Sequence, residues 1–315
     1  MKDQFLRNIK YLRISVTDLC NLRCEYCMGK DGVDKKCHSQ IMTPERIKEI
    51  VEVAVSLGIT KIRLTGGEPL IRHGILDICR YIRAIKGVDE LCITTNGVLL
   101  PLLAKPLKEA GVTRLNISLD SLNPEKYSQI TRGGDLNDVL NGIKAAKEAG
   151  FRKTKINTVL IGGFNDHEIR DFADFAQKED LDVRFIELMP IGESLSFPRE
   201  AFISNNVVLD QLPELIEMPS DGVSLQYLFP SHRGAIGLIS PLSHKFCGQC
   251  NRLRLTSDGK LKPCLHSSTE ISLDGLSGES LKKAFQEAIY RKPKEHSLKK
   301  DGKSKSKRKM YQIGG

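Results

Sequence analysis

The sequence predicts an α/β fold, a partial (open) βα barrel of about six units, with a smaller region after it. Two observations predict this. Short β-rich runs alternate with amphipathic helical patterns over the first two thirds of the chain. In addition, a helix end, a glycine, a short turn and a strand recur as LGITKIRLTG, AGVTRLNISLD and AGFRKTKINTVL. Repeated units of this kind form a parallel sheet with helical crossovers.

The individual elements follow from local patterns. A first helix begins after Thr43 as N-cap, has Pro44 in its first turn, and ends at Gly58. A second runs from Asp135 to Gly150, and a third begins near Asn165 or Asp166. The predicted strands are Leu12–Val16, Lys61–Leu64, Leu91–Thr94, Arg114–Leu119, Lys155–Leu160 and Asp182–Ile186.

The pattern loosens after Phe197, and residues up to Pro230 are expected to be irregular. A strand-like region then surrounds HKFCGQCNRLRLTSDGKLKPCL, and a last helix contains LKKAFQEAI. We therefore expect a barrel at residues 1–225, a C-terminal region at 226–298, and a basic linker with a Gly-Gly tail at 299–315.

Charge is concentrated near the end of the chain. The net charge is +9, and KKDGKSKSKRK (residues 299–309) carries seven basic residues and one acid, or +6, which leaves +3 elsewhere. This segment is interpreted as a solvated, flexible linker or, alternatively, as a contact for an anionic partner. The near balance elsewhere argues against a nucleic-acid-binding protein.

The first residues, MKDQFLRNIKYLRISV, contain no apolar stretch long enough for a signal peptide, and no run long enough to span a membrane occurs. We therefore expect a cytoplasmic protein without a membrane partner. The nine cysteines are then not expected to form structural disulfides, and metal ligation, nucleophilic chemistry or core packing must explain them.

The expected strands end in TDLCNLRCEYC, TGGEP, TTNG, SLDS and ELMPIG. Ordinary turns would explain one or two such segments but explain the whole series poorly. In folds built from βα units, the chemistry lies at the carboxyl ends of the strands. The sequence therefore places a functional site there.

The first group of cysteines is Cys20, Cys24 and Cys27, directly after the first strand. Three thiolates on one loop can hold three irons of a [4Fe–4S] cluster and leave one iron open, because such clusters normally have four Cys ligands. The alternative is zinc, which in structural sites favours closed sets of four ligands. Cys37 and His38 are the nearby candidates for a fourth ligand.

The second group is Cys247, Cys250 and Cys264. A second cluster with an open iron and a zinc site completed by His244 or His266 both fit this spacing. Arg252 and Arg254 alternate along the following strand, so they face the same side of it. Two guanidinium groups beside a metal site favour an anionic ligand, although they also fit a solvated strand face.

CNLRCEYC after a first strand resembles the signature of the radical S-adenosylmethionine (SAM) superfamily, and TGGEP one βα unit later resembles its glycine-rich motif. The resemblance implies that the open iron binds the amino and carboxylate groups of SAM. It also implies that Tyr26 contacts adenine, and that Gly66 and Gly67 let the backbone approach the SAM amino group closely.

A more specific resemblance runs from about residue 9 to 315. LRISVTDLCNLRCEYCM, RLTGGEPLIR, LNISLDSL, KINTVL, RFIELMPIG, FCGQCNRLRLTSDGKLKPCL and the terminal IGG are similar to the molybdenum cofactor biosynthesis protein A family of GTP 3',8-cyclases. The resemblance implies SAM contacts at Tyr26, Gly67, Ser118 and Met189. It implies GTP contacts at Arg13, Arg63, Thr94, Lys155, Arg252 and Arg254, and catalytic roles for Arg252, Arg254, Gly314 and Gly315.

The family's reaction is implied in the same way. An adenosyl radical made from SAM removes the 3' hydrogen of the GTP ribose, and the ribose radical attacks carbon 8 of guanine. The second cluster would hold the guanine edge, and the Gly-Gly tail would insert into the active site and support SAM cleavage. The implied partners are GTP, an electron donor such as flavodoxin or ferredoxin, and a downstream pterin-forming enzyme. A homodimer is also among the expectations.

Two other functions also fit parts of the sequence. One is another radical SAM enzyme with an auxiliary cluster, such as a peptide-modifying maturase, which would not need a phosphate-binding group of arginines. The other is a non-enzymatic zinc or nucleic-acid-binding protein. The sequence departs from the family at Gly29, where many members have proline, and in its lysine-rich tail. Cys37 has no clear role, and Cys79 and Cys92 are expected in the core.

Overall fold

A single curved sheet of twelve strands organises the molecule, in the order β12-β11-β10-β1-β2-β3-β4-β5-β6-β9-β8-β7. The computed structural model describes residues 1–33, 40–219, 222–298 and 302–314. Strands β1 to β6 pair in parallel with their sequence neighbours, and β10 and β9 extend this parallel array on either side. Among the described residues no pairing joins β12 to β7, so the barrel is open, as the sequence predicts.

The strands are β1 Tyr11–Ser15, β2 Lys61–Thr65, β3 Glu90–Thr95, β4 Arg114–Ser118, β5 Lys155–Leu160, β6 Asp182–Glu187, β7 Ile216–Met218, β8 Leu225–Leu228, β9 Ala235–Ile239, β10 Arg252–Leu255, β11 Lys260–Lys262 and β12 Ile271–Ser272. The α-helices are α1 Pro44–Ser56, α2 Ile75–Ala84, α3 Leu100–Glu109, α4 Pro124–Thr131, α5 Leu136–Glu148, α6 Ile169–Glu179, α7 Asn206–Gln211 and α8 Gly278–Tyr290. Short 3₁₀ helices are η2 Pro69–Ile71, η3 Gly192–Ser196, η4 Arg199–Ala201, η5 Cys247–Gln249 and η6 Met310–Gln312.

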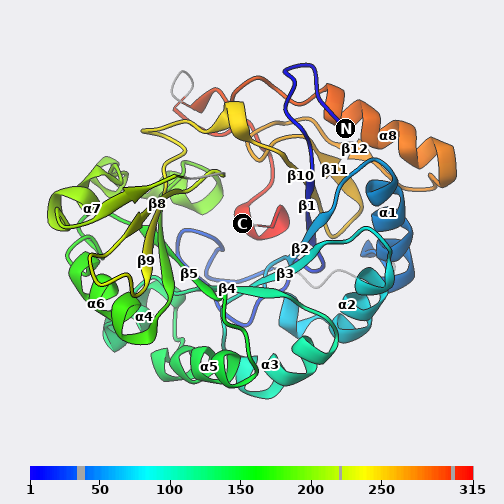
Figure 1. The fold of residues 1–315 in the computed structure, drawn as a ribbon. Coiled ribbons are helices and arrows are strands. Elements are labelled where there is room, and N and C mark those ends of the chain that lie inside the picture. The colour runs from blue at the N-terminus through cyan, green and yellow to red at the C-terminus, as the bar shows by residue number, and fades with distance from the viewer. Residues whose placement is uncertain (34–39, 220–221, 299–301, 315) are drawn as a thin grey trace.

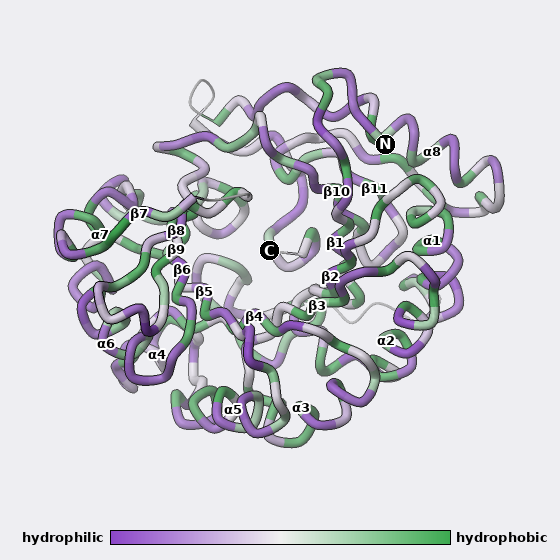
Figure 2. Tube along the Cα trace, in the orientation of Figure 1, coloured by the Kyte–Doolittle hydropathy of each residue, from purple (hydrophilic) through white to green (hydrophobic). Residues whose placement is uncertain are grey.

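The helices cover the convex face of the sheet, and the C-terminal residues lie in the space that the sheet partly encloses (Figure 1). Helix α1 shows why. It buries Ile47, Ile50, Val51 and Ala54, which lie on one face at helical spacing. Each fully buried isoleucine or valine side chain stabilises the fold by about 1.5–3 kcal/mol. Hydrophobic and hydrophilic residues alternate along these outer helices, as this one-sided burial requires (Figure 2).

The six predicted strands are confirmed to within a residue at each end, and so are the caps of two helices. Thr43 accepts a hydrogen bond from the Arg46 amide at the start of α1, and Asp135 accepts one from the Asn137 amide at the start of α5. The predicted start of the third helix is wrong by three or four residues, since α6 begins at Ile169.

The side chain of Asn165 explains this difference. It accepts a hydrogen bond from the Ile161 amide and donates to the carbonyl oxygens of Asp120 and Val159. These bonds fix a turn ahead of the helix, which is the alternative to helix that asparagine side chains offer.

The region after Phe197 is more regular than expected. It contains α7 and the antiparallel strands β7 and β8, which extend the sheet beyond β9. The sequence gives little sign of β7, because all three of its residues are exposed and so show no alternation of buried and exposed positions. In the described part of the chain, no helix is long and apolar enough to cross a membrane.

Candidate active site

The first cysteine loop and the glycine-rich segment pack directly against each other. The amide of Gly67 donates to the carbonyl oxygen of Thr17 at 2.8 Å, and the amide of Glu68 donates to that of Leu19, also at 2.8 Å. A Cβ atom on Gly67 would lie 2.2 Å from the oxygen of Leu19. Glycine is therefore required here by the adjacent backbone. The expected close approach to SAM stays a prediction beside this packing requirement.

Glu68 joins this segment to the end of β3. Its carboxylate accepts hydrogen bonds from the amides of Leu70 and Asn96 and from the hydroxyl of Thr95. Burial raises the pKa of Glu68 to about 7, against the lowering effect of these bonds. The side-chain amide of Asn96 in turn approaches the Cys20 sulfur at 3.9 Å. Residues from three strand ends are thus fixed around the first cysteine loop.

The three thiols of the first loop influence one another. Burial raises the pKa of Cys20 to about 11 and that of Cys27 to about 12. The pKa of Cys24 is raised well above its ordinary value by burial, with further contributions from Asp120, Cys27 and Cys20. Such thiols are stable as thiolates when a cationic group compensates their charge, so the loop suits a metal cluster.

Tyr26 and Asp120 form a second link in this area. The Tyr26 hydroxyl donates to Asp120 at 2.6 Å, and the other oxygen of Asp120 accepts the amide of Val159. Burial raises the pKa of Asp120 to about 6. Ser118 lies two residues away at the half-buried end of β4. Tyr26 and Asp120 therefore lie beside the first cysteines, with Ser118 two residues away along the chain, and the expected contacts of Tyr26 and Ser118 with SAM stay a prediction.

The second group of cysteines borders the central cavity, which has a volume of about 630 Å³. Cys247, Cys250 and Cys264 all line it, together with Met189 and Met310. Burial would raise the pKa of Cys250, but the charges of Lys292 and Arg252 lower it below the ordinary value. Lys292 is buried and donates to the carbonyl oxygens of Arg252 and Pro263, which ties the two parts of this group together.

Basic side chains dominate the cavity wall. Among the described residues that line it, nine are lysine or arginine and one, Glu90, is acidic. The basic residues are Arg13, Lys61, Arg63, Arg114, Lys155, Arg184, Arg252, Arg254 and Lys292. Strand register explains the clustering, because Arg13 lies between Arg63 and Arg254 on adjacent strands and all three face the same side.

This excess of positive charge disturbs the side chains that form it. Burial and the charges of Arg63 and Arg114 lower the pKa of Arg184 to about 10. Burial and the charge of Arg252 do the same to Arg254. A polyanionic ligand would relieve this repulsion. Side chains that line the cavity also carry buried atoms without a hydrogen-bond partner in the described structure, among them Arg114 Nε, Arg184 Nε, Asn116 Oδ1 and Asn157 Oδ1.

Most of the predicted substrate residues meet here. Arg13, Arg63, Lys155, Arg252 and Arg254 line the cavity, whereas Thr94 is not among its described lining residues and accepts a hydrogen bond from Arg63 at 3.0 Å. The prediction did not include Lys61, Arg114 and Arg184. Their signal was present, because each is a charged residue on a buried strand at the same alternation as a predicted one.

The C-terminal tail reaches this site. Arg254 donates to the carbonyl oxygens of Ile313, at 2.9 Å, and Gly314. Gly314 has a φ of +66°, and a Cβ atom there would lie 2.0 Å from the Thr65 hydroxyl oxygen. The amide of Tyr311 also lowers the pKa of Cys27, although burial dominates. Gly315, Cys37 and His38 lie outside the described residues.

Neither cysteine group surrounds a single point. Among the residues that the structure describes, no three His, Cys, Asp or Glu side chains are placed to hold one metal ion. A cluster makes a different demand, since each thiolate binds a different iron. His266 forms an edge-on ring contact with His296, with centroids 5.1 Å apart, and burial lowers its pKa to about 3. His244 is exposed.

An open parallel βα sheet with three cysteines after its first strand defines a class of protein. Residues 14–176 match the family model "Radical SAM superfamily". The chain belongs to this superfamily, which uses SAM and an iron–sulfur cluster. Two solved structures share the fold, Streptococcus suis SuiB bound to S-adenosylmethionine (TM-score 0.61, 15% identity, 86% of this chain and 63% of that one) and anSMEcpe with bound AdoMet (TM-score 0.61, 17% identity, 86% and 80%).

The C-terminal part makes the assignment more specific. Residues 181–298 match the model "Molybdenum Cofactor Synthesis C". Proteins named "GTP 3',8-cyclase" from Alkaliphilus oremlandii (51% identical), Alkaliphilus metalliredigens (46%) and Peptoclostridium acidaminophilum (51%) match 98–100% of both chains. The chain belongs to the GTP 3',8-cyclase family, as its motifs predict. Members are enzymes, with SAM and iron–sulfur clusters as cofactors.

Proposed function

We infer that this chain cyclises GTP between its 3' and 8 positions, and that GTP binds in the basic cavity. The placement of GTP in this cavity rests on one observation. Nine lysine and arginine residues surround a cavity of about 630 Å³ with one carboxylate among its described lining residues. A triphosphate supplies the negative charge that such a wall lacks.

The residues divide by position. Arg13, Arg63 and Lys155 would bind the phosphates, with Arg114 and Arg184 completing the wall. Thr94 would act through Arg63, to whose guanidinium it is hydrogen-bonded. Arg252 and Arg254 follow Cys250 on β10, so they would lie between the phosphates and a nucleobase held at the second cysteine group.

The two cysteine groups would each hold one [4Fe–4S] cluster, Cys20, Cys24 and Cys27 near SAM and Cys247, Cys250 and Cys264 beside the base. Bound SAM supplies the adenosyl radical that removes the 3' hydrogen. Tyr26, Gly67, Ser118 and Met189 would surround SAM. The wall of the cavity would hold the ribose in place and exclude water, since a misplaced radical would attack the protein.

The tail would complete the site, because the carbonyl oxygens of Ile313 and Gly314 are bound to Arg254. We expect that a chain ending at Ile313 retains both clusters but does not turn over GTP. A flavodoxin or ferredoxin as electron donor, a pterin-forming enzyme as consumer of the product, a cytoplasmic location and a homodimer belong to the same proposal.

The direct test is anaerobic turnover with SAM and GTP. We expect 5'-deoxyadenosine to form in a GTP-dependent manner and the cyclised nucleotide to accumulate. Formation of 5'-deoxyadenosine with a peptide, and none with GTP, would instead support a peptide-modifying enzyme. Protein that contains zinc and no sulfide would contradict both.

Binding can be tested separately with Arg184→Met and, as matched control, Arg233→Met, which removes an exposed arginine that is not among the described residues lining the cavity. The first variant should bind GTP about tenfold or more weakly, a loss of about 1.4 kcal/mol or more, and the control should be unchanged. Equal affinity of both variants for GTP would refute the placement of GTP in the basic cavity.

A further inference from the structure

The basic segment before the Gly-Gly end is an ordered strap in its described part. From residue 303 to 310 exposed and inward residues alternate. Lys303, Lys305, Lys307 and Lys309 are exposed, and Ser304, Ser306, Arg308 and Met310 are turned toward the body of the protein. A period of two is the mark of an extended chain with one face against a surface. The lysines thus form the more exposed face of the segment, and the inward face carries Ser304, Ser306 and Arg308.

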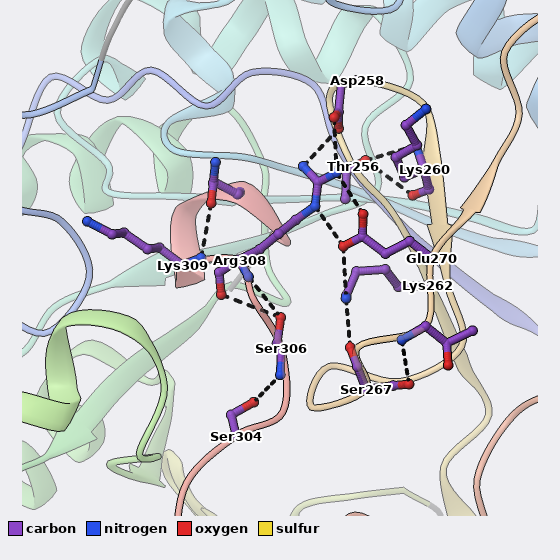
Figure 3. A network of polar contacts seen from close by, with 12 residues as sticks. Thr256, Asp258, Lys260, Lys262, Ser267, Glu270, Ser304, Ser306, Arg308 and Lys309 are labelled. Carbon is purple, nitrogen blue, oxygen red and sulfur yellow. Dashed lines mark hydrogen bonds and ion pairs between the residues drawn. The ribbon is translucent and has the colours of Figure 1, made fainter.

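Arg308 makes the strongest of these contacts. Its guanidinium donates to both oxygens of Asp258 at 3.0 Å and to both oxygens of Glu270 at 2.7 and 2.8 Å (Figure 3). Its side chain is 15% exposed. Bidentate, charge-assisted pairs are the strong class of hydrogen bond, and partial burial protects them from screening.

The two acids belong to a rigid part of the sheet. Asp258 precedes β11 and Glu270 precedes β12, the two neighbouring strands at one end of the sheet. Glu270 also pairs with the buried ammonium of Lys262 at 3.1 Å, and Lys262 donates to the carbonyl oxygen of Ser267 (Figure 3). Arg308 is therefore attached to a network that is itself anchored two residues from Cys264.

The remaining contacts of the strap are weaker. Ser304 is hydrogen-bonded to His266 at 3.1 Å, and its amide donates to the carbonyl oxygen of Pro190. Lys309 pairs with Glu193 at 2.6 Å, but its side chain is 46% exposed. Exposed ion pairs of this kind contribute little. Arg308 is the point at which the strap is most firmly held.

The chain beyond Arg308 leads directly into the site. Met310 lines the cavity, Tyr311 is buried, and Arg254 donates hydrogen bonds to the carbonyl oxygens of Ile313 and Gly314. Only five residues separate Arg308 from Gly314, so an anchored Arg308 restricts where the end can go. Loss of the anchor would restore the conformational freedom of this short segment.

We propose that Arg308 is the positioning residue of the C-terminal tail, and that its double clamp on Asp258 and Glu270 keeps Gly314 docked against Thr65 and Arg254. Its effect on turnover rests on the proposed function, whereas its effect on docking does not. Arg308 is not among the described residues lining the cavity, so it acts through the position of the tail and not on GTP.

Docking is measured first, by hydrogen exchange of the amides of residues 310–314 in the anaerobically reconstituted enzyme. In Arg308→Gln these amides should exchange about tenfold or more faster, which corresponds to about 1.4 kcal/mol or more of lost docking. The matched control is Lys307→Gln, which removes the adjacent exposed charge and should stay within about twofold of the unsubstituted protein. Arg308→Lys keeps the positive charge but loses the bidentate hydrogen bonds, so its exchange rate should lie between those of Arg308→Gln and Lys307→Gln.

Turnover is the second readout. In Arg308→Gln, kcat should fall about tenfold or more while the KM for GTP stays within about threefold, because the cavity wall is intact. Exchange in Arg308→Gln at the unsubstituted rate would overturn the proposal. If Arg308→Gln loses iron, the same exchange measurement is made on Asp258→Asn, which removes one of the two carboxylates that hold Arg308. Unchanged exchange of the tail amides in Asp258→Asn would then overturn the proposal. Faster tail exchange in an enzyme that does not cyclise GTP would leave the anchor standing and refute the proposed function alone.

Discussion

The substitution Gly67→Ala tests how the first cysteine loop is built. A Cβ atom at position 67 would lie 2.2 Å from the oxygen of Leu19, 2.6 Å from its carbonyl carbon and 2.7 Å from the oxygen of Asp18. All three are backbone atoms, so no side chain can rotate away. To reach an ordinary contact of 3.4 Å, the chain must move by about 1.2 Å directly before Cys20.

The magnitude follows from two effects. Forcing one extra carbon into a closely packed region costs about 1–3 kcal/mol. The shift also strains the hydrogen bond from the Glu68 amide to Leu19, which contributes about 1 kcal/mol. We expect Gly67→Ala to lower the free energy of unfolding by about 2–4 kcal/mol and to displace Cys20 from the other two cysteines.

The assay combines urea unfolding with iron and sulfide analysis after anaerobic reconstitution. The unsubstituted protein should hold about eight irons per chain and the variant about four, because the second cysteine group is unaffected. Gly248→Ala is the matched control, since a Cβ atom there meets nothing within 4 Å although it lies between two cysteines. A Gly67→Ala protein with eight irons and unchanged stability would refute the backbone argument. A Gly67→Ala protein that keeps all eight irons but no longer binds SAM would support the SAM contact expected from the sequence.

Three further predictions follow from the site. Glu68 has a folded-state pKa of about 7, above its ordinary 4.5, so the folded protein binds more protons and is destabilised by ionisation as pH rises from about 4.5 through 7. In urea titrations, the free energy of unfolding of the unsubstituted protein should therefore fall by about 1–3 kcal/mol relative to that of Glu68→Gln between pH 5 and 8. A difference between the two proteins that does not change with pH would contradict the raised pKa of Glu68. Lys292→Met removes a buried ammonium that donates to two carbonyl oxygens. We expect the free energy of unfolding to fall by about 2–5 kcal/mol and about four irons to be lost, all from the second cysteine group. Full iron content would show that this group does not need Lys292. Tyr26→Phe removes the 2.6 Å hydrogen bond to the buried carboxylate of Asp120. We expect SAM binding to weaken about fivefold or more in equilibrium titration, with GTP binding unchanged. Unchanged SAM affinity would show that Tyr26 is not part of the SAM site.

Much of the site could be predicted because its residues follow strands. In a parallel sheet the carboxyl ends meet at one edge, so Cys20, Gly67 and Ser118 could be expected together from their places after successive strands. Alternation along a strand also predicted that Arg252 and Arg254 face the same side. The same rule applied to the other strands would have found Lys61, Arg114 and Arg184.

The sequence by itself determined the open sheet, the two groups of three cysteines and the basic character of the cavity strands, because periodicity and spacing are local properties of a chain. The tertiary structure alone decided that the glycines of TGGEP fit against the cysteine loop, and that Lys292 joins the two parts of the second group. It also decided that Arg308 is clamped between Asp258 and Glu270. Each of these depends on atoms that are distant in sequence and meet through packing and register, for which no local pattern carries a signal.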